Sequence, residues 1–185
     1  MATGRLILAP RDPYLLLGQA PLLAALQGLK LTGAPLPNRS LAYSAGDAFM
    51  QWISFAGCSP FLRFEPESSE DDAFCHIRLT LVMGNQPLFL GGNNSKPPVC
   101  SHCKHTLTEW RQLMQQWQED QPTPACSKCG TRIEPAGLNW RRHAGLGRTL
   151  VEIFNVFPAE AVPVPALFDR LLQHTGCSWH YFYVQ

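Results

Sequence analysis

The sequence predicts an α+β fold in which helices cover one face of a mainly antiparallel sheet. Two observations lead to this prediction. Segments with the alternation and residue types of strands are interspersed with segments of helical spacing near both ends of the chain. Glycine (14 residues) and proline (16 residues) favour many turns over long helices. We expect a ferredoxin-like or split β-α-β arrangement, with an inserted module between its two halves.

Length and composition limit the possible classes of protein. The 185 residues suit one compact domain with a small insert, and the 45% of apolar residues can form a hydrophobic core. Charged residues are only 16% of the chain, and the formal net charge is +1. These values exclude a globally basic nucleic-acid binder and a polyanionic chain.

The N-terminal segment, residues 1–38, predicts a strand, a helix and a linker. The apolar run Leu6–Ala9 suits a strand. From Pro21 onward leucines recur at helical spacing, with Gly33 near the helix end and a proline-containing linker over 32–38. Because these leucines cover nearly all sides of the helix, we expect it to be buried or docked on a partner. The leucines are Leu22, Leu23, Leu26 and Leu29.

Residues 39–95 predict the first half of the α+β core. Ser44–Asp47 offers capping residues before an apolar segment, and a later segment alternates as strands do. We expect the two strands of this half to form a hairpin. The predicted elements are, in order, a helix over 48–55 closed by Gly57, a strand over 61–64, an acidic turn over 65–72 and a strand over 74–82.

Residues 149–185 predict the second half of the core. We expect a strand over 150–157, a helix over 163–175 that Gly176 ends, and a terminal strand over 179–184 rich in aromatic and β-branched residues. When the sequence is aligned with itself at a shift of 119 positions, Gly57-Cys58-Ser59 matches Gly176-Cys177-Ser178. This faint repeat has two interpretations: an internal duplication, or glycine placed independently where helices turn into strands.

Four of the seven cysteines form two Cys-x-x-Cys pairs, Cys100/Cys103 and Cys126/Cys129, separated by 22 residues. A two-residue gap lets both sulfurs of a turn face one ion, and two such turns complete a tetrahedron of thiolates, the closed geometry of structural zinc. Gly130 supplies the permissive backbone that follows such a turn. An iron–sulfur cluster or a redox dithiol is the alternative to Zn²⁺.

Residues 97–135, which contain these pairs, resemble the zinc-ribbon class, in which two such knuckles hold one metal. A plain ribbon has strands between its knuckles, whereas Thr108–Trp117 predicts a helix with Trp110 and Trp117 on one face. His102 and His105 could compete as ligands, but four thiolates suffice without them. A four-sulfur site has no open position for water, so the predicted role is structural and not catalytic.

Residues 96–148, the expected insert and basic arm, carry most of the positive charge. They hold eight Lys or Arg against four Asp or Glu, a net of +4, and the rest of the chain has a net of −3. Beyond the second knuckle, arginines accompany a tryptophan in a pattern that suits phosphate contact and base stacking. The candidate nucleic-acid-binding residues are Trp140, Arg141, Arg142 and Arg148. The alternative is a solvated loop, paired with the acidic turn over 65–72.

A second reactive site is the weaker interpretation of the remaining cysteines. Cys75 and His76 would point to opposite faces of a strand. Cys58 and Cys177 would approach each other only if the two halves were duplicated, and no activating base is evident. We expect these cysteines to be packing residues, because free cysteine is among the most buried residue types.

Three hypotheses for function follow. The first is a non-catalytic adaptor that binds a partner protein through apolar surface and a zinc-stiffened insert, with Leu22, Leu23, Leu26, Leu29, Trp110 and Trp117 as candidate contacts. The second is a zinc-ribbon nucleic-acid-binding protein. The third is an enzyme or enzyme subunit, with a pocket that holds Cys58, Cys177 or His180 between the two halves.

The cysteine pattern and the leucine-rich start also bear on location. Paired Cys-x-x-Cys motifs with an odd cysteine total favour metal binding in a reducing compartment. The stretch Tyr14–Leu31 is too often interrupted for a membrane span and lacks the form of a signal peptide. We therefore expect a cytoplasmic protein.

Overall fold

The computed structural model describes residues 4–55, 62–68, 71–119, 122, 124–157 and 160–185. Within them the fold is α+β, as predicted: a six-stranded antiparallel sheet with strand order β10-β1-β8-β5-β3-β2, and two two-stranded sheets, β4-β9 and β6-β7. The strands are β1 (Gly4–Pro10), β2 (Thr32–Pro35), β3 (Ala42–Ala45), β4 (Ile53–Phe55), β5 (His76–Leu81), β6 (Leu88–Gly91), β7 (Ala144–Gly147), β8 (Thr149–Val156), β9 (Ala161–Pro163) and β10 (Trp179–Val184). The helices are α1 (Gln19–Gly28), α2 (Phe49–Trp52), α3 (Trp110–Gln118) and α4 (Pro165–Thr175).

The main sheet contains two split β-α-β units. The first is β1-α1-β5 and the second is β8-α4-β10, and each leaves room for a strand of the other unit between its own two strands. Every neighbouring pair in the sheet is antiparallel, with β8 and β5 at the centre. The hairpin β2-β3 extends the sheet beyond β5. This is the arrangement that the order of strands and helices predicts.

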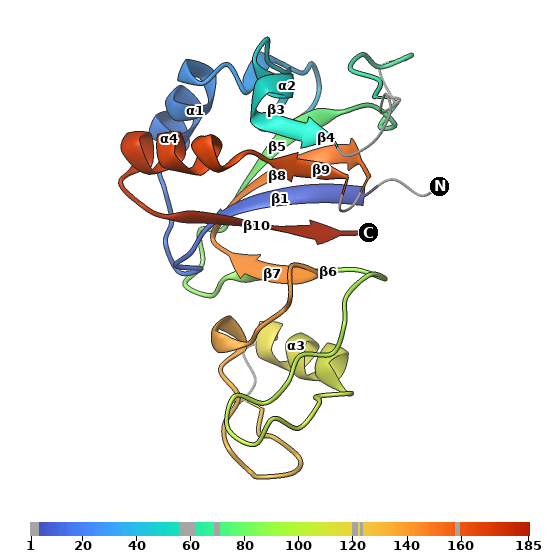
Figure 1. The fold of residues 1–185 in the computed structure, drawn as a ribbon, viewed down its shortest axis with the longest axis vertical. Helices are drawn as coiled ribbons and strands as arrows, with labels where there is room; N and C mark the ends of the chain where they lie inside the picture. Colours follow the sequence, from blue (N-terminus) through green and yellow to red (C-terminus); the bar gives the residue numbers. More distant parts are fainter. Residues whose placement is uncertain (1–3, 56–61, 69–70, 120–121, 123, 158–159) are drawn as a thin grey trace.

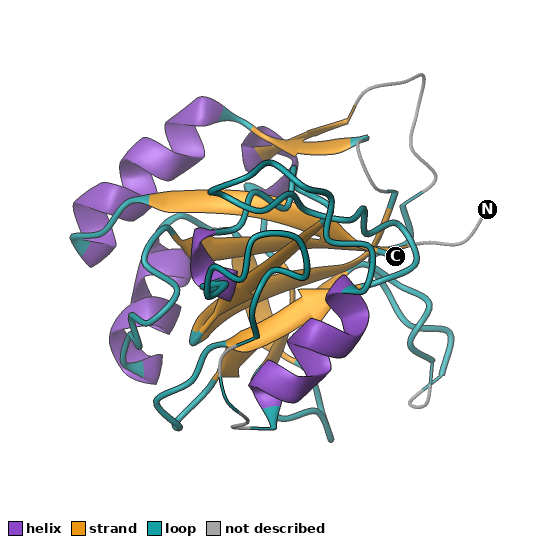
Figure 2. Ribbon diagram, turned by 90° about the horizontal axis from the view of Figure 1, so that it is seen from below, coloured by secondary structure: helices purple, strands orange, loops and turns teal. Residues whose placement is uncertain are grey.

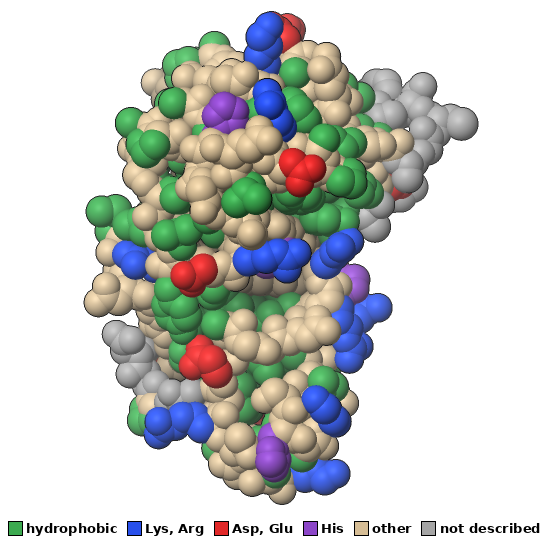
Figure 3. All heavy atoms as spheres, turned by 60° about the vertical axis from the view of Figure 1, so that its left-hand side comes forward, with side chains coloured by type: hydrophobic (Ala, Val, Ile, Leu, Met, Phe, Trp, Pro, Cys, Tyr) green, Lys and Arg blue, Asp and Glu red, His purple; other side chains and the backbone are tan. Residues whose placement is uncertain are grey.

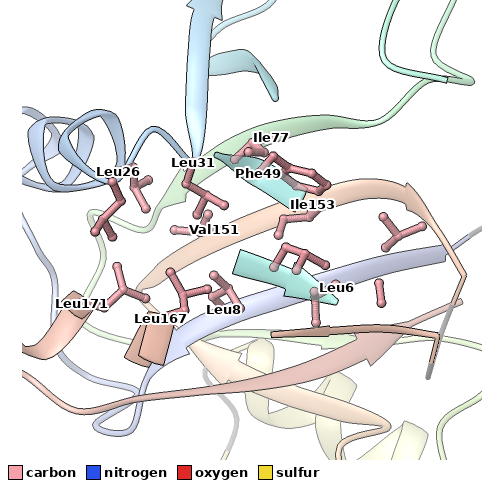
Figure 4. Close-up of a cluster of buried hydrophobic side chains, with 14 of the residues drawn as sticks. Leu6, Leu8, Leu26, Leu31, Phe49, Ile77, Val151, Ile153, Leu167 and Leu171 are labelled. Atoms are coloured by element: carbon pink, nitrogen blue, oxygen red, sulfur yellow. The ribbon is translucent and has the colours of Figure 1, made fainter. Parts of the chain in front are cut away.

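Helices α1 and α4 cover one face of the sheet, where the main core lies (Figure 1). Leucines from both helices meet alternate residues of β1 and β8, because side chains two apart in a strand share one face (Figure 4). Burying one such leucine or isoleucine contributes about 1.5–3 kcal/mol. The fully buried members from α1, α4, β1 and β8 include Leu6, Leu8, Leu22, Leu26, Val151, Ile153, Leu167 and Leu171.

The opposite face of the sheet is covered in part by the β6-β7 ribbon, the base of a long insert between β5 and β8 (Figure 2). Leu88 and Leu90 of the ribbon pack against Ile7, Leu150 and Phe182. The approach is close: a Cβ atom on Gly145 would lie 2.4 Å from the buried Phe182 ring. Glycine at this position lets the ribbon lie against the sheet. From here on, "the insert" means residues 88–147, from β6 to β7. The sequence predicts an insert that begins at residue 96, after β6.

The insert also closes one edge of the main sheet. The Tyr183 N–H donates to the Arg142 carbonyl over 2.9 Å, and the Asn93 N–H donates to the Gln185 carbonyl over 2.6 Å. Edge β10 therefore has partners for part of its outer row of backbone groups, and pairing of that row with another chain is hindered there.

Two expected elements of the first half are wrong. The helix expected over 48–55 is one turn, α2, followed by β4, because Ile53 pairs with Pro163 and Phe55 with Ala161. Residues 62–64 form no strand, and β5 pairs with β3 and β8 instead of closing a hairpin with them. The expected linker over 32–38 contains β2. Gly57, Cys58 and Phe61 lie outside the described residues.

His76 gives the fold a predictable acid sensitivity. The ring is 4% exposed, stacks on Phe154 at 4.6 Å, and its Nδ1–H donates to the Phe74 carbonyl over 3.0 Å. Burial lowers the pKa of His76 below its usual 6.5, and Arg39 and Arg78 oppose its protonation while Asp72 favours it. The unfolded chain therefore binds a proton that the folded chain does not, and stability is lost as pH falls below about 6.5.

We expect urea unfolding midpoints to fall between pH 7.5 and pH 5.5, and to fall less in His76→Phe. The phenyl ring keeps the stack, and the Phe74 carbonyl keeps its bond from Asn155 Nδ2. Burial also lowers the pKa of His143 and of His180, so some dependence remains in the variant. An equal fall in both proteins would contradict the role of His76.

Candidate metal centre

The two Cys-x-x-Cys pairs form two knuckles with the same backbone pattern. In the first, the Cys100 N–H donates to the His105 carbonyl and the Lys104 N–H to the Cys100 carbonyl, over 2.8 and 3.0 Å. In the second, the Cys126 N–H donates to the Thr131 carbonyl and the Gly130 N–H to the Cys126 carbonyl, over 2.9 and 2.8 Å. Each knuckle is thus a tight turn with both sulfurs on one side. This repetition is the local structure that the two-residue gap predicts.

The knuckles place the four sulfur atoms of Cys100, Cys103, Cys126 and Cys129 within 4.8 Å of one another. The Sγ atoms of Cys100 and Cys129 are 3.8 Å apart, and those of Cys103 and Cys126 are 3.7 Å apart. Four sulfurs about 2.3 Å from one Zn²⁺ in a tetrahedron lie about 3.8 Å from each other. The separations therefore suit a tetrahedral metal, and they are far too long for disulfides of about 2.05 Å. Neither His102 nor His105 belongs to this group.

Hydrogen bonds within the knuckles favour the thiolate form, which a metal requires, at Cys100 and Cys129. At Cys103 the His105 N–H lowers the pKa, but desolvation and the three neighbouring sulfurs outweigh it and raise the pKa to about 11. The Cys103 N–H, and then the His102 N–H, bond the Cys100 sulfur and lower the pKa of that thiol despite its desolvation. Thr131 bonds the Cys129 sulfur with its hydroxyl and its amide and lowers the pKa of Cys129 to about 6. These donors would remain as partners of the sulfurs in a metal complex.

A small aromatic core joins the knuckles to the rest of the insert. Cys100 and Cys126 are 2% exposed and belong to the same cluster as Trp110, Met114 and Trp117 of α3. Because these three residues recur at helical spacing, α3 buries one face, as its sequence predicts. The Trp140 ring contacts Phe89 at 4.9 Å and Trp110 at 5.5 Å between centroids. The cysteine knuckles and the β6-β7 ribbon therefore share one core.

Lys104 and Gly130 occupy equivalent left-handed positions of the two knuckles, with φ +60° and φ +69°. A Cβ atom on Gly130 would meet nothing within 4 Å, so only the backbone conformation favours glycine there. We expect Gly130→Ala to lower the free energy of unfolding of the zinc-loaded protein by about 1 kcal/mol. Lys104→Gly should raise it by roughly 0.5 kcal/mol, because relief of strain is partly offset by glycine's entropy.

Chemical denaturation of the zinc-loaded variants measures both effects. Equal losses in Gly130→Ala and Lys104→Gly would show that the left-handed conformation does not limit knuckle stability.

The apolar candidates for partner contact lie mostly inside the protein. Leu22, Leu26 and Leu29 are at most 5% exposed in the main core, and Leu23 is partly buried beside it. Trp110 and Trp117 are 3% and 7% exposed in the core of the insert. Their apolar character is thus explained by packing within the chain.

The four candidate nucleic-acid contacts separate in the structure. Trp140 is 6% exposed, and Arg148 binds the backbone carbonyls of Val82, Tyr14 and Met83. Only Arg141 and Arg142 are exposed. They lie beside Arg11 and His180, which are far away in sequence, and no spacing or motif could have brought these four together.

Of the remaining cysteines, Cys75 lies in the main core, where burial raises the pKa of its thiol to about 12. Cys177 is partly buried, with its sulfur 3.3 Å from the Thr175 hydroxyl. Both have the surroundings of packing residues. Cys58 lies outside the described residues, so a Cys58–Cys177 pair is untested.

The fold and the site define an α+β protein with an inserted four-cysteine module. No family model, no curated protein and no solved structure matches this chain. Among the described residues, every helix is too short or too polar to span a bilayer.

Proposed function

We propose that this chain is a non-catalytic binding protein in which one structural zinc ion folds the insert and holds it against the sheet. The observation that carries the proposal is the cluster of four sulfur atoms within 4.8 Å. Zinc with four thiolates has no open coordination position, so it cannot activate water or a substrate. Its contribution is folding energy, which a small aromatic core supplements.

The proposed partner is another protein, and the candidate contact is an apolar pair next to the insert. Tyr14 and Met83 are 44% and 79% exposed, and the Arg148 guanidinium binds the backbone carbonyls of both, over 3.2 and 3.4 Å. The Tyr14 hydroxyl also donates to Glu134 Oε1 over 2.9 Å, so its ring stays exposed beside the insert. Two large exposed side chains whose backbones one guanidinium binds are a candidate interaction surface. The nucleic-acid alternative is weaker, because burial of Trp140 removes the base-stacking side chain.

Affinity capture from the protein's own cells, with nuclease, tests this proposal. We expect Met83→Glu to lose a partner protein that the wild type and Met50→Glu retain. Met50 is the matched control, because it is 52% exposed on α2, away from Arg148. Loss of every partner on nuclease treatment would contradict the proposal, as would equal capture by both variants or purified protein without zinc.

A further inference from the structure

A cavity of about 420 Å³ lies where the insert meets the main sheet. Its walls come from three parts of the chain: the loop after β1, residues 136–146 of the insert, and β10. Figure 3 shows Lys and Arg side chains along this boundary, with an acidic side chain among them, above a hollow with hydrophobic side chains. The volume lies within the range typical of small-molecule sites.

The polar lining of the cavity is cationic. Arg11, Arg141, Arg142 and His180 line it, and its lining contains no Asp or Glu. Among the described residues none of these three arginines forms an ion pair, whereas Arg5, Arg39, Arg63 and Arg78 each do. Asp12, next to Arg11 in sequence, accepts the Tyr14 N–H over 3.0 Å and is not part of the lining. Three guanidiniums without carboxylate partners make the lining of the cavity positively charged.

Backbone hydrogen bonds hold the segments that carry Arg11 and Arg142, and the Arg142 guanidinium donates to the Tyr181 hydroxyl over 2.5 Å. The Arg11 N–H donates to the Ser178 carbonyl over 2.8 Å, at the start of β10. The Arg142 carbonyl accepts the Tyr183 N–H, and the Arg142 guanidinium lies 4.3 Å from the centre of the Tyr181 ring. Arg141 and Arg142 are both left-handed, with φ +51° and φ +63°. Two successive left-handed residues turn the chain sharply at this point and place both arginines on the cavity wall.

His180 lines the cavity together with Arg11 and Arg142 and is close enough to feel the charge of both. Burial lowers the pKa of its ring, and the charges of Arg11 and Arg142 lower it further. The same three residues and Tyr181 also line a second hollow of about 350 Å³, with Phe168 and Trp179. The two hollows therefore share the cationic residues Arg11, Arg142 and His180, and each also has apolar or aromatic lining. We call these three residues the cationic point.

We propose that this point binds the phosphate of a small phosphate-bearing ligand of mononucleotide size, whose remainder occupies the apolar part of the cavity. Planar guanidinium forks match phosphate oxygens in pairs, and Leu138, Leu146 and Phe182 supply apolar lining for the rest of the ligand. The site needs the insert to be docked on the sheet, because Arg11 and His180 belong to one part and Arg141 and Arg142 to the other. Met83, the residue that tests the proposed protein contact, does not line this cavity.

Isothermal titration calorimetry of the zinc-loaded full chain tests the proposal, with the four ribonucleoside 5′-monophosphates, their nucleosides and inorganic phosphate as probes. We expect at least one monophosphate to bind, its nucleoside to fail, and phosphate alone to bind more weakly. Arg11→Gln and Arg142→Gln should each weaken binding by roughly 10- to 100-fold. Arg170→Gln, an exposed arginine on α4 outside the cavity, is the charge-matched control.

Zinc content and thermal unfolding of each variant show whether the insert is folded. Arg11 is exposed, so Arg11→Gln should disturb packing least. Failure of all monophosphates and of phosphate, or equal binding by Arg11→Gln and Arg170→Gln, would overturn the proposal. So would a single-stranded oligonucleotide that binds far more tightly than any monophosphate, since the site would then recognise a nucleic acid. Met83→Glu should bind the monophosphate as the wild type does, so failure of this site and failure of the protein contact are separate results.

Discussion

Cys126→Ser is expected to abolish zinc binding and unfold the insert, while Cys177→Ser keeps both zinc and fold. Cys126 is 2% exposed, and its sulfur lies 3.7 Å from that of Cys103. A serine hydroxyl stays protonated at neutral pH and is a poor ligand for zinc. Structural zinc contributes about 10–16 kcal/mol to the folding of small zinc modules, so the aromatic core alone should not hold the insert.

Metal analysis measures the first effect, and hydrogen exchange of α3 and of β6-β7 measures the second. Cys177 is the matched control, because it is a partly buried free cysteine outside the four-sulfur group. Protected amides across α3 in a zinc-free Cys126→Ser protein would contradict a structural role for the metal. The main sheet should keep its protection in all cases, since its helix-side core contains no residue of the insert.

Trp140→Ala is expected to lower the free energy of unfolding by about 3–5 kcal/mol, the usual loss when a buried tryptophan is truncated. The ring is 6% exposed, packs on Phe89 and Trp110, and its Nε1–H donates to the Pro135 carbonyl over 3.3 Å. Trp140→Phe should lose less, because a phenyl ring still fills most of the space. Chemical denaturation with zinc in excess measures both losses.

Arg141→Ala is the neighbouring control for this experiment. Arg141 is exposed, so its truncation should leave the free energy of unfolding almost unchanged. A base-stacking Trp140 would behave in the same way. Unchanged stability in Trp140→Ala would therefore favour the nucleic-acid hypothesis and contradict burial of the ring.

The sequence was most informative where the signal is local. The strand over 179–184, the helix that Gly176 ends and the two knuckles each depend on residues within a few positions of one another. Gly176 has φ +71°, the left-handed helix end that glycine favours. In the first half, by contrast, the segment 48–55 has helical spacing but divides into α2 and β4. The partner of β4 is β9, more than 100 residues later, and no local pattern contains that pairing.

The same distinction separates the two candidate sites. Two Cys-x-x-Cys turns were enough to predict a four-sulfur site, because each turn directs two sulfurs to one side, and the structure brings all four sulfurs within 4.8 Å of one another. The cationic cavity exists only after folding, because Arg11, Arg142 and His180 come from a loop, the insert and a sheet strand. Apolar residues behave likewise: leucine and tryptophan content predicts burial or an interface equally well. Only the tertiary structure shows that most of these leucines, and both tryptophans of α3, are buried inside the chain. Contacts with neighbouring side chains of the same chain remove them from water, so they need no partner.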